Sequence, residues 1–189
     1  MEKEKVAQKH KRLSRSDWLQ AALETMQGAG VAGVKVAPLA ARLGVTTGSF
    51  YWHFKNRREL HDALLEYWER EMTDAVIDAA NAFAGSPRER IWRLMEQVMT
   101  AGLASLDLAL WHWAQTDTGA RRAFKRVLKK RFEFAARTFS QAGFSDEQAE
   151  VRGRMMVVYM MGESTLVSGP MAKRKKNLKL KHAILTAPE

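Results

Sequence analysis

The pattern of apolar and polar positions along the chain is helical almost throughout. Apolar residues recur three or four positions apart, and glycine or proline separates one run from the next. We therefore predict an all-α fold of about nine helices. They are expected at about 17–30, 36–43, 47–53, 57–84, 87–105, 106–118, 118–142 and 145–167, with a short final helix after residue 170. The first is expected to end near Gly28 to Gly30, and the fifth near Gly102 or Ser105.

Capping residues mark several of the predicted helix starts. Ser16 is a good cap for the first helix, and Asn56 for the long fourth helix. The run Ser86-Pro87-Arg88-Glu89 has the arrangement of a capping box, with proline at the first helical position. The segment 85–87 is therefore the clearest boundary between two helices in this chain.

The stretch 34–60 reads as two short helices joined by a tight turn, with a third helix following at once. Gly44 is expected to end the first helix, because glycine adopts the left-handed conformation of a helix end without steric cost. Thr46 is expected to cap the second helix, with Phe50 and Phe54 on its apolar side. Small polar residues open that helix on its other side. Such a helix is suited to the major groove of double-stranded DNA.

The residues around this second helix divide by the part of DNA that they would reach. Those expected near base edges are Thr47, Ser49 and Trp52, with Gly48 allowing close approach. Those expected mainly at phosphates are Thr46, Tyr51, His53 and Lys55, with Lys35 and Arg57 as further contacts. The basic arm 3–15 either contacts phosphates or a minor groove, or is a solvated leader.

The run LAARLGVTTGSFYWHFKNRREL resembles the helix-turn-helix of the TetR family of bacterial repressors. The matching positions are Leu39, Ala40, Gly44, Val45, Thr46, Tyr51, Phe54, Lys55 and Leu60. Tyr51-Trp52-His53 is close to the tetracycline repressors themselves. The resemblance covers about 14–65 and is looser beyond. One departure is Lys35, which stands where the family usually has a capping Thr or Ser.

The resemblance implies two domains and a ligand-responsive mode of action. Residues 1–62 would form the arm and the three-helix DNA-binding domain, and residues 63–189 a helical domain for ligand binding and dimerisation. The implied function is a homodimeric regulator, typically a repressor, that binds a palindromic operator and is released by a small apolar effector. Movement of the long helix 57–84 would couple the effector to DNA affinity.

Net charge supports a nucleic-acid partner. The chain carries +10, and its two ends are basic while its middle is balanced. Residues 1–60 hold eleven Lys/Arg against five Asp/Glu, and residues 171–189 hold six against one. The chain has no cysteine, which suits a reducing cytoplasm, and no apolar run long enough to cross a membrane. We expect no secretory signal at its N-terminus.

The second half of the chain offers candidates for an effector pocket, although for any single Trp among them ordinary core packing is the favoured interpretation. They are aromatic and methionine side chains: Met95, Met99, Trp111, Trp113, Phe132, Met156 and Tyr159. The helix 118–142 also has a basic side that runs from Arg121 to Arg131. That side is either solvated or able to bind an anion.

The segment 145–167 is apolar nearly all round, so it needs a partner on more than one side. A homodimer through Met155, Val158, Met161 and Leu166 would supply one, and its methionines could also line a pocket. The basic tail 171–189 is expected to complete the dimer interface with a short helix.

Two other classes of function remain to be weighed. A non-specific or architectural DNA-binding protein would use the same basic ends and would need no effector. An enzyme is not indicated, because no catalytic triad, paired carboxylates or phosphate loop stands out. We expect no metal site and no cofactor.

Overall fold

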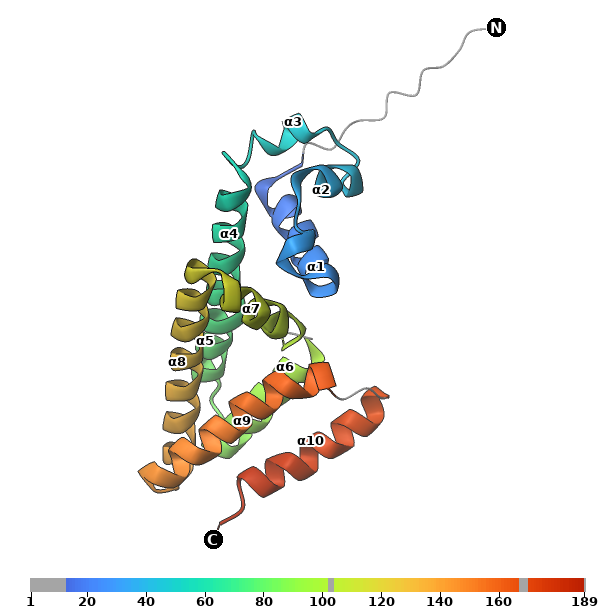
Figure 1. Ribbon diagram of the computed structural model, residues 1–189. Coiled ribbons are helices and arrows are strands. Elements are labelled where there is room, and N and C mark those ends of the chain that lie inside the picture. The colour runs from blue at the N-terminus through green and yellow to red at the C-terminus, as the bar shows by residue number, and fades with distance from the viewer. Residues whose placement is uncertain (1–12, 102–103, 167–169, 189) are drawn as a thin grey trace, which may run out of the picture.

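The computed structural model describes residues 13–101, 104–166 and 170–188, and they are almost entirely helical (Figure 1). The elements are α1 (Arg15–Gly33), α2 (Val36–Arg42), α3 (Thr47–Phe50), α4 (Arg57–Glu69), the π-helical segment η1 (Arg70–Asp74), α5 (Ala75–Ala82), α6 (Pro87–Thr100), α7 (Ala104–Thr116), α8 (Thr118–Gln141), α9 (Asp146–Leu166) and α10 (Met171–Leu185). Because α4, η1 and α5 are continuous, the described residues form nine helical rods, as predicted. The basic arm before residue 13 lies almost wholly outside the described residues.

The three N-terminal helices, α1 to α3, form a head at one end of the molecule, and α10 lies near the other end (Figure 1). Trp18 of α1 is fully buried and meets Phe50 of α3 edge to face, with 5.3 Å between the ring centroids. Phe50 stacks on Phe54 at the same distance. These three rings hold α3 from behind, so that its opposite side stays free.

The first helix begins two residues earlier than predicted. Ser14, and not Ser16, is its cap: the Ser14 hydroxyl accepts a hydrogen bond from the Asp17 N–H, and the Asp17 carboxylate accepts from the Ser14 N–H. This reciprocal pair needs an acidic residue three positions after the serine, which only Ser14 has. At the other end α1 is broken at Gly30, where φ is +63°, within the region where its end was expected.

The fourth rod leads from the head into the body. Asn56 caps it as predicted, accepting from the Glu59 N–H at 3.0 Å. The rod then runs 57–82, close to the predicted length, but its middle is the π-helical segment η1, which the sequence pattern did not predict. A π-helical turn inside a longer helix is uncommon and often marks a functional site.

The body packs α6 to α10 around the lower half of the rod. Ser86 and Glu89 form the predicted capping box at the start of α6. The two longest body helices, α8 and α9, approach closely at Gly153, where a Cβ atom would lie only 2.8 Å from the Ala136 nitrogen. The start of α8 is capped by Asp117, whose carboxylate accepts from the Ala120 N–H.

Two apolar clusters fill the interior. The first joins the head to the upper body, since it contains Trp18 and Phe50 together with Leu110, Trp113 and Phe124. The second holds α6, α8, α9 and α10 together around Met95 and Phe139. Packing is therefore continuous across the predicted domain boundary at residue 62. Within the described residues, no helix combines the length and apolar character that crossing a bilayer requires.

Candidate nucleic-acid interface and cavity

The turn between α2 and α3 is tight and specified by its residues. Gly44 has φ of +69°, a left-handed conformation that favours glycine over residues with a side chain. The N–H of Val45 then donates to the Ala40 carbonyl at 3.0 Å, which closes the end of α2. Thr46 occupies the cap position of α3, but its side chain makes no capping hydrogen bond, contrary to the prediction. Within the described part of the chain, the Thr46 hydroxyl makes no hydrogen bond and can meet another partner.

The helix α3 is shorter than predicted. The residues directly after it carry the most exposed aromatic side chains of the head. The α-helix ends at Phe50 and continues as a turn through His53, which was predicted to be helical. Trp52 is 86% exposed and Tyr51 62% exposed. A tryptophan left so open on a folded domain indicates a surface that meets a partner.

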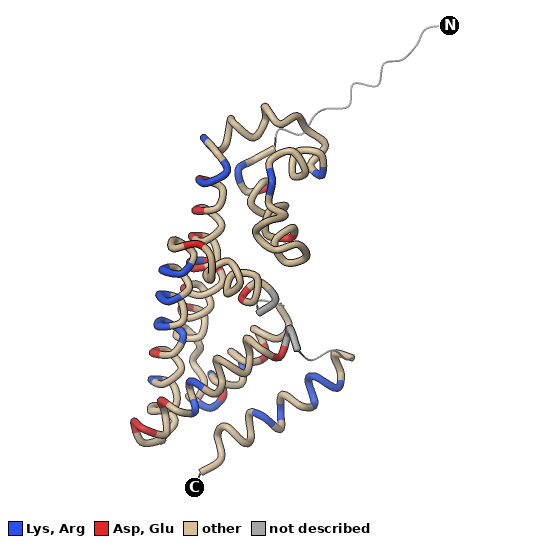
Figure 2. The backbone as a smooth tube through the Cα atoms, viewed as in Figure 1, with Lys and Arg blue, Asp and Glu red and all other residues tan. Residues whose placement is uncertain are grey.

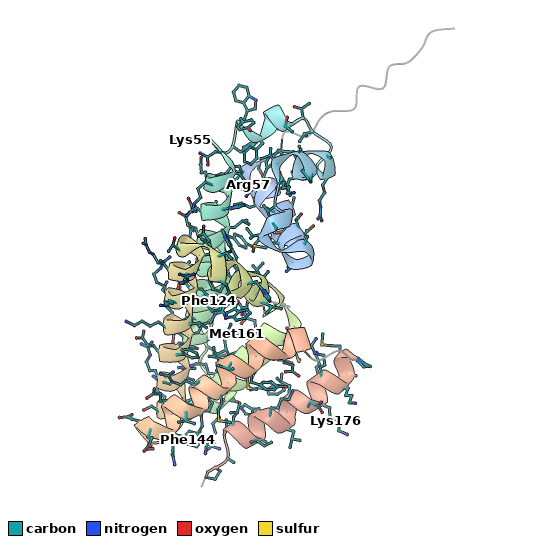
Figure 3. The ribbon with its side chains drawn as sticks, viewed as in Figure 1. Lys55, Arg57, Phe124, Phe144, Met161 and Lys176 are labelled. Atoms are coloured by element: carbon teal, nitrogen blue, oxygen red, sulfur yellow. The ribbon has the colours of Figure 1, made fainter. Side chains whose placement is uncertain are left out.

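All ten residues predicted to contact DNA lie at the surface of the head. Lys35, Thr46, Thr47, Gly48, Tyr51, Trp52, Lys55 and Arg57 are exposed, and Ser49 and His53 are half-buried. Lys35 is the cap residue of α2 without a capping bond, as its chemistry predicted. Among the described residues, the side chains of Lys35, Lys55 and Arg57 form no ion pair, so their charges are free for phosphate. Figure 3 labels two of them, Lys55 and Arg57.

The head is fastened to the body at the start of α4. The Arg58 guanidinium donates to Asp62 at 3.0 Å and to Asp117, the cap of α8, at 2.9 Å. The Ala120 N–H and the Arg58 charge hold the pKa of Asp117 below its ordinary value. Reasoning from the sequence did not find this contact, because its partners lie 59 residues apart.

His61 lies buried in the same junction. Its ring meets Trp113 of α7 edge to face at 5.2 Å. Burial, and then the charge of Arg57, lower the pKa of His61, while a hydrogen bond with the Val34 backbone and the charge of Asp117 act in the opposite direction. The neutral imidazole is therefore the form that suits the folded state.

A cavity lies in the body between η1, α5, α6, α8 and α9, and its volume is about 60 Å³ when only positions open to the centre of a water molecule are counted. Because one water needs about 10–15 Å³ counted in this way, the cavity has room for more than one. Its wall is mostly methionine and branched apolar side chains, with a single polar corner. The lining residues are Met72, Thr73, Val76, Ile77, Leu94, Met95, Val98, Asp107, Arg131, Phe134, Met156, Val157, Met160 and Met161.

The residues predicted for an effector pocket are only partly gathered there. Met95 and Met156 line the cavity. Met99 is buried beside it in the second cluster, and Phe132 packs against that cluster from its edge. Trp111 is 45% exposed on α7, and Trp113 lies in the junction with His61. Tyr159 lies under the Lys181 ammonium, 4.4 Å from its ring centroid.

The polar corner was not predicted, although Asp107 carried a signal. Asp107 is buried in an apolar stretch of α7, and it accepts from the Trp68 indole at 2.8 Å and from Arg131 at 2.6 Å. Arg131 was assigned to the basic side of α8 as solvated or anion-binding, but its side chain is 15% exposed and points inward. Figure 2 shows how the remaining Lys and Arg residues follow the outer side of α8.

The residues predicted for a dimer interface are divided between two surfaces. Met155 is 56% exposed and Val158 60% exposed, and they lie with Val151 on one stripe of α9. Met161 instead lines the cavity, where Figure 3 labels it. The helical position of Leu166 is described, but its side chain lies outside the described part of the structure.

Comparison with known proteins gives the head a family. Residues 19–64 match the bacterial regulatory proteins of the tetR family. The class C tetracycline repressor protein of Escherichia coli is 46% identical over 134 residues, which are 71% of this chain and 57% of that protein. The class D repressor of the same organism is 43% identical over 53 residues, 28% of this chain and 24% of that protein.

Residues 19–64 form a domain of the tetR family. The whole chain spans just over half the length of the class C repressor. A TetR transcriptional regulator from Legionella pneumophila has the same fold, with a TM-score of 0.75 and 14% identity over 92% of this chain and 95% of that chain. AibR, solved in complex with isovaleryl coenzyme A and operator DNA, also has this fold. Its TM-score is 0.72 at 19% sequence identity, and the match covers 93% of this chain and 99% of that chain. Within the described residues, no cluster of His, Asp or Glu is placed to hold a metal ion.

Proposed function

We propose that this chain is a cytoplasmic transcriptional regulator, acting as a repressor, that binds a palindromic DNA operator as a homodimer. A small, mainly apolar effector is proposed to release it. The observation that carries the proposal is the surface of the head. Small polar residues and two open aromatic rings lie on α3 and directly after it, and this helix is packed only from behind. Three cations that form no ion pair within the described residues, Lys35, Lys55 and Arg57, are exposed on the same head. The regulators that the chain resembles are not enzymes, and the proposal includes no catalytic step.

The homodimer is supported by an uncovered apolar stripe on α9. Val151, Met155 and Val158 are spaced four and three residues apart, and Ile184 of α10 lines the same groove as the first two. A second copy of the chain would cover this stripe with its own. Two heads related by a two-fold axis then require half-sites one helical turn of DNA apart, or a multiple of it.

The selection of duplexes from a random pool at physiological salt tests the proposal against its main alternative. A regulator of this kind should enrich a sharp palindrome. A non-specific or architectural DNA-binding protein, which would use the same basic ends, should return a flat sequence profile and show no response to small molecules. A flat profile would therefore reject the operator-binding proposal.

Lys55 is expected to contact phosphate and not a base. The variant Lys55→Ala should weaken binding to all duplexes by a similar factor, because phosphates carry no sequence information. It should also reduce the slope of log K against log salt concentration by roughly one unit. Fluorescence anisotropy at four or five salt concentrations measures both quantities. An unchanged slope would remove Lys55 from the phosphate contacts.

Thr47, the first residue of α3, is expected to read a base edge. The variant Thr47→Ala should change the preferred base at one position of each half-site and leave the salt slope as it is. A wrong base at one position typically costs about 1–3 kcal/mol, so the preference is measurable. Repeating the duplex selection with the variant gives the answer. An operator profile identical to that of the wild type would exclude Thr47 from the reading residues.

His61 should make the stability of the head–body junction depend on pH. Its folded pKa is lowered, so the unfolded chain takes up the proton first, near the ordinary value of about 6.5. Stability is therefore full above that pH and falls as the pH drops through it toward the lowered value. The variant His61→Gln should lose less stability than the wild type between pH 7.5 and 5.5, as measured by urea midpoints. Equal losses in both proteins would contradict this assignment.

A further inference from the structure

The polar corner of the cavity joins the cavity wall to the rod that carries the head. Arg131 of α8 donates to Thr73 from Nε at 3.2 Å and from a terminal nitrogen at 3.1 Å, and to the Met72 carbonyl at 3.4 Å. Its other terminal nitrogen donates to Asp107 at 2.6 Å. Both partners on the rod, Met72 and Thr73, belong to the π-helical segment η1. One side chain therefore contacts the cavity and the irregular turn of the rod at the same time.

The outer side of the same segment is held by neighbouring residues of α8. Lys130 pairs with Asp74 at 2.8 Å and with Glu69 at 3.0 Å, and Arg126 pairs with Glu69 at 2.9 Å. These pairs are partly exposed, so each contributes little by itself. They fix the outside of η1 in register with α8. The contact that a ligand can reach is the inner one, through Arg131.

The charges around the cavity restrict the ligand class. Of the lining residues, only Arg131 and Asp107 are ionisable acids or bases, and they neutralise each other across 2.6 Å. An ionised ligand would bring an unpaired charge into apolar surroundings, which is costly. A cation would also face the Arg131 guanidinium. The balance of charge favours a neutral molecule.

The hydrogen bonds at the corner define the polar group of that molecule. Both Asp107 oxygens already accept, one from Trp68 and one from Arg131. Within the described part of the chain, Arg131 makes four hydrogen bonds with its five N–H groups, and its contact with Met72 is long. The corner therefore has a donor to offer and takes an acceptor oxygen such as a carbonyl.

We propose that the cavity binds a neutral, mostly hydrocarbon molecule with one acceptor oxygen, that Arg131 recognises this oxygen, and that Arg131 thereby loosens its hold on η1. Binding draws the guanidinium away from Thr73 and Met72, so that the π-helical turn is free to shift. A ligand changes a conformational equilibrium only through contacts that differ between the two states, and the Arg131–Thr73 bond is that difference. The part of the inference that concerns release from DNA rests on the function proposed above.

Ligand recognition is tested on the full-length protein without DNA. The probes are heptan-2-one, hexanoate and hexyltrimethylammonium, which share a similar chain length and differ in charge. At ten times its dissociation constant, heptan-2-one should raise the melting temperature by about 3–6 °C. Hexanoate and hexyltrimethylammonium should give no more than a third of that shift at the same concentration. Equal shifts for the three probes, or none with the ketone, would overturn the ligand class.

Transmission is tested with Thr73→Val and the matched control Thr138→Val. Both threonines are buried, but Thr138 donates only to the Phe134 carbonyl of its own helix. In the wild type and in Thr138→Val, heptan-2-one should speed amide exchange in peptides covering residues 68–76 at least about threefold. In Thr73→Val, exchange should already be fast and should change less than about 1.5-fold. If Thr73→Val responds as the control does, the role of Arg131 in transmission is rejected.

The variant Arg131→Lys gives an independent check of recognition. It keeps the charge pair with Asp107 but loses the planar fork, so the ketone should lose most of its advantage over hexanoate. A full ketone shift in this variant would overturn recognition by Arg131. None of these measurements uses DNA. A failed duplex selection with a positive ketone shift would reject the proposed function alone, and the reverse pattern would reject this inference alone.

Discussion

Replacing Asp107 by alanine should lower the free energy of unfolding by about 3–5 kcal/mol, because it leaves the inward-pointing Arg131 guanidinium without its counter-ion. It also removes the acceptor of the Trp68 indole N–H, which is buried with it. This loss of stability is expected because the substitution removes one partner of the buried Asp107–Arg131 pair and leaves the other charged. Urea denaturation at pH 7 and at one fixed protein concentration measures it, since the stability of an oligomer depends on concentration.

The matched control is Asp62→Ala, which removes an aspartate whose carboxylate contacts Arg58 on the surface. Its side chain is about half exposed, as is that of Arg58. Such a pair contributes about 0–1 kcal/mol. If Asp107→Ala cost no more than this control, the polar corner would not be the buried, charge-balanced cluster described above.

The second large effect is expected from Val158→Glu in the middle of the exposed stripe of α9. Two-fold symmetry brings the new carboxylates of both copies into one interface, and unpaired like charges there cost several kcal/mol. The dimer dissociation constant should rise by at least about 100-fold. Analytical ultracentrifugation over a range of concentrations measures this, and operator binding should weaken in parallel.

Leu108→Glu serves as the control for that variant. Leu108 is also an exposed apolar residue, but it belongs to α7 and is not part of the stripe on α9. The same substitution there should leave the dimer intact. A Val158→Glu protein that remained as tightly dimeric as this control would show that α9 does not form the interface.

Local chemistry made much of the fold predictable. Asn56, Ser86 and Gly44 act through neighbours within a few residues, so the sequence shows both the residue and its partner. The head was predictable for the same reason, since its turn, its apolar side and its small polar side all lie within one short stretch. The prediction of Ser16 as the cap of α1 was wrong, which shows the limit of such local reasoning. Ser14 and Ser16 are both suitable caps, and the position of Asp17 favours Ser14.

The body could be predicted less well because its site is made by contacts between distant residues. Trp68, Asp107 and Arg131 come from three helices, and nothing in the spacing of one helix specifies the next. The available signal was an aspartate within the apolar stretch of α7, which demanded a buried partner. Trp113 shows the converse: its apolar character was clear, but whether it faced the cavity or His61 depended on packing.

The π-helical segment η1 left no mark in the sequence pattern. It shifts the register of the rod by one residue within a stretch that still reads as a continuous helix. Its position beside the cavity and its hydrogen bond with Arg131 depend on how α8 packs against the rod, which the sequence pattern does not show. The connection between the cavity and the head is therefore a tertiary feature, whereas the surface around α3 is a local one.

The most direct test of the account is a titration of the purified protein against the selected palindrome and a scrambled duplex at physiological salt, with the number of chains per duplex determined. We expect two chains per palindrome and binding at least about 1,000-fold tighter than to the scrambled sequence. Equal affinity for both duplexes, or a single bound chain, would contradict the claim that paired heads read DNA through α3.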